Sequence, residues 1–252
     1  PKNYMGEPIE GSMERILAGA PSPIVTPPTK SITPGDLTPA NINNPEKYII
    51  LPGMQHGSYS YPDLLVAMER THQGKNWYDS HKMLNSEGAS MLSIRQFVDF
   101  LNLLKNGIRG NNVYDGRGQK LDDGELQNIL NDIIEVRDPW RSEWLDAKFE
   151  KTNATLGLFG GNMVINYEHR IVNNNLKAQK IEPLEECLMT DKKPGIDMTH
   201  WLENSTYQGL PSKNSTDGDL WYWYPRDGAV AGFYADSGGA LLNCGRNPTL
   251  TY

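Results

Sequence analysis

The chain has 252 residues and a formal net charge of −7. This acidic balance argues against nucleic acid or an anionic membrane as a main partner, because both attract basic surfaces. No apolar run is long enough to span a bilayer and no signal peptide is visible at the start, so we expect no membrane insertion. The compartment stays open, and display at a surface would need a partner.

The first 46 residues are rich in proline and poor in large apolar residues. They follow neither a helical nor a strand period, which predicts an extended Pro-rich arm or linker over 1–46. The remainder, 47–252, is long enough for one large domain. The 6 Trp, 12 Tyr and 5 Phe of the chain can fill its core.

Two amphipathic helices are predicted in the first half of that domain. Ser93 and Gln96 form a capping box ahead of apolar residues at helical spacing, and Asn106-Gly107 ends the helix. The second helix begins at Asp122 or Asp123. The apolar faces comprise Phe97, Phe100, Leu101 and Leu104 in the first helix and Leu126, Ile129, Leu130 and Ile133 in the second.

Shorter helices are expected on either side of this pair. Asn76 is a candidate cap for a helix that runs through Leu84. Trp140, Trp144 and Phe149 are interpreted as core residues on a third short helix.

Strand patterns occupy the ends of the domain. Residues 48–51 predict a short strand that ends at Pro52-Gly53. Residues 163–172 and 176–181 predict a β-hairpin around the Asn-rich turn 173–175. Early helices and late strands together predict an α+β domain.

The C-terminal run alternates over most of its length, which is the period of a strand. One parity, with Trp221, Trp223, Phe233, Leu242 and Cys244, is expected to lie in the core. The phase slips by one after Gly239, which indicates a turn or bulge. The other parity is rich in Tyr, Asn and Gly, as in an antibody paratope, whereas plain exposed strands carry Lys, Glu and Thr. An exposed sheet edge with incidental aromatic residues is the alternative interpretation.

Two strings in this region, WYWYPRDG and VAGFYADSGGALLNCGRNP, resemble the variable region of proteins diversified by diversity-generating retroelements. The similarity is strongest to those of nanoarchaeal and related uncultivated archaeal lineages. Such proteins carry a C-type lectin fold of the formylglycine-generating-enzyme type, and adenine-specific mutagenesis alters the residues on their last strands. The resemblance therefore implies a C-type lectin fold over 47–252, with 219–252 as the variable region.

The resemblance also implies which positions are fixed and which vary. The implied invariant positions are Trp221, Val230, Ala231, Phe233, Ala235, Ser237, Gly239, Ala240, Leu242, Cys244, Arg246 and Pro248. The implied variable, ligand-binding positions are Tyr222, Tyr224, Arg226, Tyr234, Asp236, Gly238, Leu241, Asn243, Gly245, Asn247, Thr249 and Thr251. Family members usually continue into a Leu-Gly-Val-Arg-like end, whereas this sequence stops at Tyr252. Either the sequence is truncated there or the edge of the binding face is built differently.

The implied function is non-catalytic recognition of a macromolecule, a protein or a cell-surface target, by a monomer without a cofactor. Two alternatives stay open. Asp236-Ser237-Gly238-Gly239 is similar to the nucleophile motif of trypsin-like proteases, so Ser237 could serve a hydrolase. However, no histidine has the Ala-Ala-His-Cys context of that family. A structural protein with a fixed aromatic interface is the other alternative.

Neither the cysteines nor the potential metal ligands of the sequence support an enzymatic function. A formylglycine-type oxidase needs a close pair of metal-binding cysteines, but Cys187 and Cys244 are far apart in sequence. They could form a disulfide, although free buried cysteine is the commoner state when there are only two. No Cys or His cluster has zinc spacing, so no metal site is expected. His81 is interpreted as a packing residue on the same helical face as Trp77.

Overall fold

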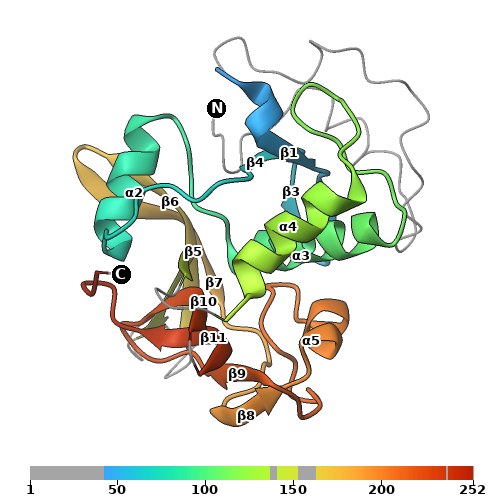
Figure 1. The fold of residues 1–252 in the computed structure, drawn as a ribbon. Coiled ribbons are helices and arrows are strands. Elements are labelled where there is room, and N and C mark those ends of the chain that lie inside the picture. The colour runs from blue at the N-terminus through green and yellow to red at the C-terminus, as the bar shows by residue number, and fades with distance from the viewer. Residues whose placement is uncertain (1–42, 137–140, 153–162, 237, 252) are drawn as a thin grey trace.

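The structure is a computed structural model that describes residues 43–136, 141–152, 163–236 and 238–251. Helices pack on a large, mostly antiparallel sheet (Figure 1), so the predicted α+β class is confirmed. Most of the predicted arm, 1–46, lies outside the described residues. In the part of the chain that the structure describes, no helix has the length and apolar character needed to cross a bilayer.

The main sheet has seven strands in the described residues, in the order β7-β6-β5-β10-β11-β9-β8. The strands are β5 (Arg141–Lys151), β6 (Met163–Val172), β7 (Asn175–Pro183), β8 (Lys192–Ile196), β9 (Leu220–Trp223), β10 (Val230–Asp236) and β11 (Gly239–Arg246). Paired strands are antiparallel except β9 and β11, which are parallel. The C-terminal strand β10 therefore lies at the centre of the sheet, between β5 and β11.

Two small sheets complete the strands. They pair β1 (Tyr48–Leu51) with β4 (Leu64–Ala67), and β2 (Met54–His56) with β3 (Tyr59–Tyr61). The first of these confirms the short strand predicted at 48–51. The predicted hairpin is confirmed as β6–β7, and its turn residues Asn173 and Asn174 have φ values of 52° and 61°. Asn tolerates this left-handed conformation better than most residues with a Cβ.

The helices are α2 (Trp77–Ser86), α3 (Ile94–Ile108), α4 (Asp123–Ile134) and α5 (Met198–Asn204), with a 3₁₀ turn η1 (Pro45–Lys47). The capping box of Ser93 and Gln96 is present at the start of α3. The Asn76 side chain caps α2 and Asp122 caps α4. Each of these ends was predictable because capping depends on residues adjacent in sequence.

The helices take different positions around the sheet. Helices α3 and α4 pack on one another, and α2 packs against β6. In Figure 1, α3 and α4 lie together on one side of the main sheet, while α2 lies beside β6 at the other end.

One predicted helix is wrong. Trp144 and Phe149 lie on strand β5, and Trp140 lies outside the described residues. Leu145, Ala147 and Phe149 are all buried at a spacing of two, the period of a strand. The three large aromatic residues suggested helical packing, but the side chains between them follow the strand period.

Candidate binding face

One side of strands β9, β10 and β11 faces the main core, which is the hydrophobic core that also contains the buried residues of α3 and α4. We call this side of the strands the inner side. The register places Leu242 beside Tyr222 of β9 and opposite Phe233 of β10, so these side chains share that side. All three are 0% exposed. The Phe233 ring lies 5.3 Å from the ring of Phe97 between centroids, and Cys244 is buried in the same core. The expected burial of Phe233, Leu242 and Cys244 is confirmed.

The expected phase of β9 is wrong. Trp221 and Trp223 were expected in the core, but both are half-buried and lie on the opposite side of the sheet from Tyr222. Tyr222 was expected to face a ligand, but it is fully buried and its hydroxyl donates a hydrogen bond to the carbonyl of Leu188 at 2.9 Å. Residues 221–224 are all aromatic, so no polar residue indicates which parity faces water.

We call the exposed or half-buried residues on the other side of these strands the outer face. It comprises Trp221, Trp223, Asp236 and Asn243, and we include with them Lys193 of β8 and the exposed Arg226 of the loop after β9. The rings of Trp221 and Trp223 lie 5.9 Å apart between centroids. The Lys193 Nζ lies 4.2 Å from the centroid of Trp221, within the range of a cation–π contact. The surface therefore combines two large rings with cationic and polar groups.

Another group of stacked aromatic and cationic side chains lies next to the outer face. The guanidinium of Arg246 lies between two rings, 3.8 Å from the centroid of Tyr234 and 4.3 Å from that of Trp144. Its Nη1 also donates to Ser142 Oγ at 3.1 Å. Tyr234 and Arg246 are buried. Tyr234 was expected to contact a ligand, but the packing of its ring against Arg246 makes it part of the scaffold.

The other expected ligand-binding positions divide between surface and interior. Leu241 is buried, and Tyr224 is half-buried against the main core. Asn247, Thr249 and Thr251 are exposed but lie beyond β11. They flank Pro248, whose carbonyl accepts a hydrogen bond from the Trp77 amide at the start of α2. The structure therefore brings only part of the expected set together on the outer face.

Two glycines of the expected set differ in the room around them. A Cβ on Gly238 would meet the Trp221 ring at 2.7 Å, so a larger residue would force that ring to move. A Cβ on Gly245 would meet the Arg226 side chain at 3.1 Å. The Arg226 guanidinium pairs with Asp191 at 2.6 Å, but this ion pair is at the surface, where such pairs contribute little to stability. The Arg226 side chain can therefore shift at little cost. Gly245 is thus the more tolerant position.

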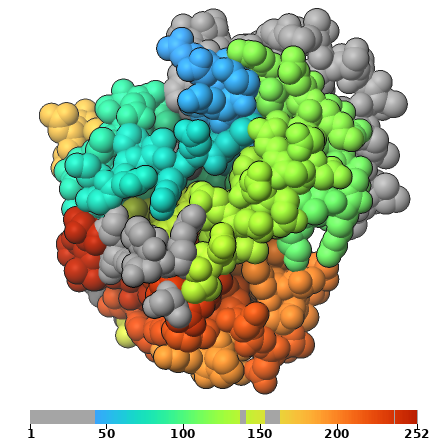
Figure 2. All heavy atoms as spheres, viewed as in Figure 1, coloured from blue at the N-terminus to red at the C-terminus, as the bar shows by residue number. Residues whose placement is uncertain are grey.

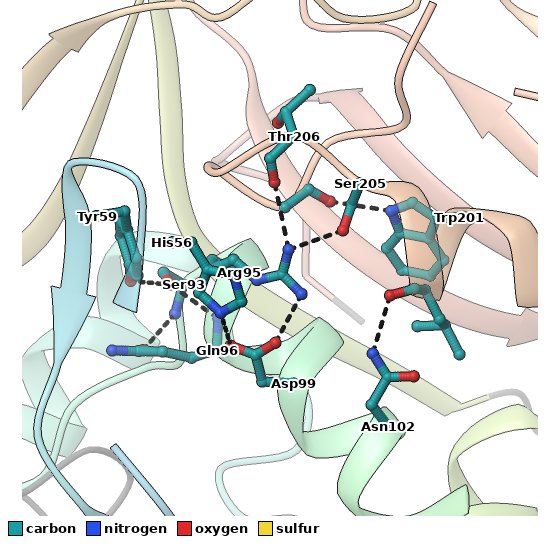
Figure 3. A network of polar contacts seen from close by, with 12 residues as sticks. His56, Tyr59, Ser93, Arg95, Gln96, Asp99, Asn102, Trp201, Ser205 and Thr206 are labelled. Carbon is teal, nitrogen blue, oxygen red and sulfur yellow. Dashed lines mark hydrogen bonds and ion pairs between the residues drawn. The ribbon is translucent and has the colours of Figure 1, made fainter. Parts of the chain in front are cut away.

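A buried polar network at the start of α3 is a separate candidate site (Figure 3). The Asp99 carboxylate accepts hydrogen bonds from Arg95 at 2.6 Å and Tyr61 at 2.6 Å, and lies 2.8 Å from His56 Nε2. Arg95 also donates to Ser205 at 2.8 Å. Burial raises the pKa of Tyr61, and the adjacent Asp99 raises it further. The Asp99 carboxylate is well supplied with donors, so this network anchors the β2–β3 hairpin and the loop after α5 to α3.

A hollow of about 310 Å³ lies between the segment after β4, helices α3 and α4, and strand β5. Figure 2 shows the surface hollowed between the blue-green segment and the yellow-green helix α4. Phe97, Phe100, Ile129 and Ile133 contribute apolar walls. The Arg141 guanidinium beside it is already paired with Asp132 and Glu143. No residue of the outer face lines this hollow.

The two enzymatic alternatives gain nothing from the described residues. Ser237 lies outside them, although its neighbours Asp236 and Gly238 are described. Cys187 and Cys244 are free and buried. Burial raises the pKa of the Cys187 thiol to about 12 and holds that of Cys244 well above its usual range. Both thiols are therefore protonated at neutral pH, unlike the thiolates that bind metals or attack substrates.

Comparison with protein-family models, with curated proteins and with solved structures finds no match to this chain. The function of the chain is therefore inferred from the residues and geometry of the site itself.

Proposed function

We propose that the outer face of β9–β11 binds a macromolecular ligand without catalysis. The observation that carries this proposal is the position of Trp221 and Trp223, which lie half-buried on the surface and not in the core. Trp and Arg are enriched among the residues that dominate binding energy at protein interfaces. The two indoles lie 5.9 Å apart between centroids, Lys193 contacts one of them, and the exposed Arg226 follows in the loop after β9.

The scaffold under this face favours a binding role. Strand β10 lies in the middle of the main sheet, and the inner side of β9–β11 packs in the main core. A site on packed strands is held more firmly than one on loops. Outer-face residues can therefore change while their backbone positions stay fixed by Phe233 and Leu242.

The C-type lectin fold and diversification by a retroelement belong to the same proposal. The α+β architecture and the placement of the C-terminal strands at the sheet centre agree with such a fold. Diversification without loss of folding would be restricted to the exposed or half-buried polar and glycine positions of 219–252. On the outer face these are Arg226, Asp236 and Asn243, with Gly245 between Cys244 and Arg246. We expect Tyr222, Tyr234 and Leu241 to stay constant because they are buried.

Two libraries test the binding proposal. In the first, Arg226, Asp236, Asn243 and Gly245 are randomised, and in the matched second library four inner positions are randomised, namely Tyr222, Phe233, Leu242 and Cys244. Each library is displayed on yeast, and both the display level and the enrichment against a panel of unrelated proteins are measured. We expect the first library to retain display and yield binders, whereas the second loses display because buried positions are changed.

A control variant locates the binding surface. Selected binders should lose binding when Trp221 and Trp223 are replaced by Ala, and retain it when Tyr207 is replaced by Ala. Tyr207 is a 53% exposed aromatic residue outside the outer face. Loss of display in the first library, or binders that do not depend on the two tryptophans, would contradict the proposal.

A fixed-interface structural protein remains the competing function, because paired tryptophans also suit a permanent contact. The two functions differ in sequence variation. A fixed interface keeps Arg226, Asp236 and Asn243 constant among sister sequences, whereas a diversified surface changes them.

A further inference from the structure

Three ionisable side chains from three elements meet in the core between α2 and the main sheet. His81 lies on α2, Asp146 on β5 and His169 on β6, and all three are buried. One potential ligand atom from each lies within 4.8 Å of the other two. His169 Nδ1 is 2.5 Å from Asp146 Oδ1, and His81 Nε2 is 3.5 Å from the same oxygen. The sequence analysis missed this cluster because no spacing rule joins residues of three separate elements.

The sheet is irregular where it carries two of these residues. On β5, the pairing with β10 shifts register around Asp146. On β6, Glu168 directly precedes His169 and has a φ of 56°. The left-handed conformation is unfavourable for a residue with a Cβ. Such irregularities often re-aim side chains at functional positions, and here they accompany two residues of one cluster.

Within this cluster, His81 is the residue whose ring nitrogens make no hydrogen bond to the described residues. Its side chain is 0% exposed, yet neither ring nitrogen has a hydrogen-bond partner among the described residues. Its ring packs against Trp77, with 4.3 Å between centroids, and lies 5.3 Å from the ring of His169. A buried polar group without a partner destabilises the fold, a cost that an apolar residue at this position would avoid. A ligand that binds the His81 nitrogen would explain why an imidazole is present.

We propose that His81, Asp146 and His169 bind a divalent transition-metal ion of the Zn²⁺ type. Two imidazoles and one carboxylate suit Zn²⁺, whereas Mg²⁺ and Ca²⁺ prefer oxygen ligands throughout. With metal–ligand bonds of about 2.0–2.2 Å, two tetrahedral ligand atoms lie about 3.3–3.6 Å apart. The 3.5 Å between His81 Nε2 and Asp146 Oδ1 already satisfies this condition.

Of the two remaining pairs, that of the two imidazole nitrogens lies within 4.8 Å, and that of His169 and Asp146 requires a local change. His169 Nδ1 and Asp146 Oδ1 are hydrogen-bonded at 2.5 Å, so the ion takes the place of the proton between them and the two atoms separate by roughly 1 Å. The backbone N–H of His169 donates to Asp146 Oδ2 at 3.0 Å. This hydrogen bond fixes the carboxylate plane, as the outer hydrogen bonds of metal ligands usually do.

The role of the ion in this proposal is structural. Its ligands connect α2 to both β5 and β6, and the Trp77 indole covers the two imidazoles edge-on at 4.3 and 4.9 Å. Because the site is enclosed, the ion enters as the chain folds, and its binding energy adds to the free energy of unfolding. The inference is independent of the outer face, since no outer-face residue contributes a ligand.

The test is to refold the full chain with and without metal. The protein is unfolded in guanidinium with a chelator, freed of chelator, and refolded with Zn²⁺ or in metal-free buffer. Metal content is measured by mass spectrometry after gel filtration, and the Tm is recorded. We expect about one Zn²⁺ per chain and a higher Tm with Zn²⁺. Refolding with Co²⁺ should give the intense visible absorption of a four-coordinate site, in which a water molecule joins the three protein ligands.

Two variants locate the ion. His81→Leu removes the unpartnered nitrogens and should bind no Zn²⁺, while its Tm in metal-free buffer stays at or above that of the wild type. The matched control His72→Gln changes a histidine that lies 3.1 Å from Glu87 outside the cluster, and should bind Zn²⁺ normally. Equal Zn²⁺ binding by His81→Leu and wild type would overturn the assignment. So would a wild-type chain that gains neither Zn²⁺ nor Tm, which decides the matter even if His81→Leu does not fold.

Discussion

The inner and outer sides of β9–β11 belong to the same backbone but differ in what fixes their side chains. On the inner side, Tyr222, Phe233 and Leu242 are 0% exposed and packed in the main core. On the outer face, Trp221 and Trp223 are half-buried and Arg226 is exposed. Alternate residues of one strand therefore carry separate tasks, since neighbours along a strand point to opposite faces. The difference predicts where substitutions unfold the chain and where they change only its surface.

The largest expected effect is on thiol reactivity at the inner side. Burial raises the pKa of Cys187 to about 12 and raises that of Cys244 well above its usual range. The thiolate is the reactive form, and at pH 8 the pH is far below both pKa values, so only a very small fraction of each thiol is ionised. Both thiols should therefore react with Ellman's reagent more than about a hundredfold slower than free cysteine. In guanidinium both should react at once. Fast reaction of Cys244 in the folded chain would contradict the burial of the inner side, and fast reaction of Cys187 would contradict the burial of the segment before β8.

The largest expected effect on stability is that of Phe233→Ala. Its ring is fully buried and contacts Phe97 and Trp201, so the substitution should lower the free energy of unfolding by about 3–5 kcal/mol. Denaturant titration measures it. Trp223→Ala, on the outer face of the neighbouring strand β9, is the control and should cost less, and equal losses would mean that the two sides are not distinct.

A smaller effect is expected from removal of one inner hydroxyl. Tyr222→Phe keeps the buried ring but removes the hydrogen bond to the Leu188 carbonyl. The loss should be about 1 kcal/mol, the usual net value of such a bond. Tyr224→Phe, at a half-buried position, serves as the comparison and should change the free energy of unfolding less. If Tyr222→Phe cost no more than Tyr224→Phe, the buried hydrogen bond of Tyr222 to Leu188 would be contradicted.

The smallest effects are expected on the outer face itself. Arg226→Ser should change the free energy of unfolding by about 0.5 kcal/mol or less, as exposed substitutions usually do. Asp236→Ser and Asn243→Ser, at half-buried positions, should each cost about 1 kcal/mol or less, because each side chain accepts one backbone hydrogen bond, from Gly238 and Gly245 respectively. The Arg226–Asp191 ion pair is exposed, so its loss adds little. Unfolding of the triple variant under native conditions would show that these residues belong to the scaffold.

The sequence predicted what is decided locally. Capping residues and the 3.6-residue period predicted helices α3 and α4, and the strand pattern of 163–172 before an Asn-rich turn predicted β6. It failed where the answer depends on distant strands. The phase of β9 is set by its register with β11, and an all-aromatic stretch such as 221–224 has no polar residue to indicate that phase.

The remaining misses have the same origin. Trp144 and Phe149 read as helical packing because large aromatic side chains suit both helices and strands, and only the pairing of β5 with β6 and β10 decides between the two. The cluster of His81, Asp146 and His169 arises when α2 packs on two strands. Contacts of this kind are tertiary, so the local periodicity of the sequence does not predict them.

The most direct test of the binding account is to sequence this locus from many cells of one population, together with any nearby near-copy of its last hundred or so bases. We predict substitutions at the codons of Arg226, Asp236 and Asn243, at adenine positions of the copy, with Phe233 and Leu242 constant. Tyr222 is the most informative position, because the family resemblance implies that it varies whereas its burial requires that it stay fixed. A uniform C-terminal region without a copy would contradict diversification, and free variation at Tyr222 would contradict the assignment of the two sides.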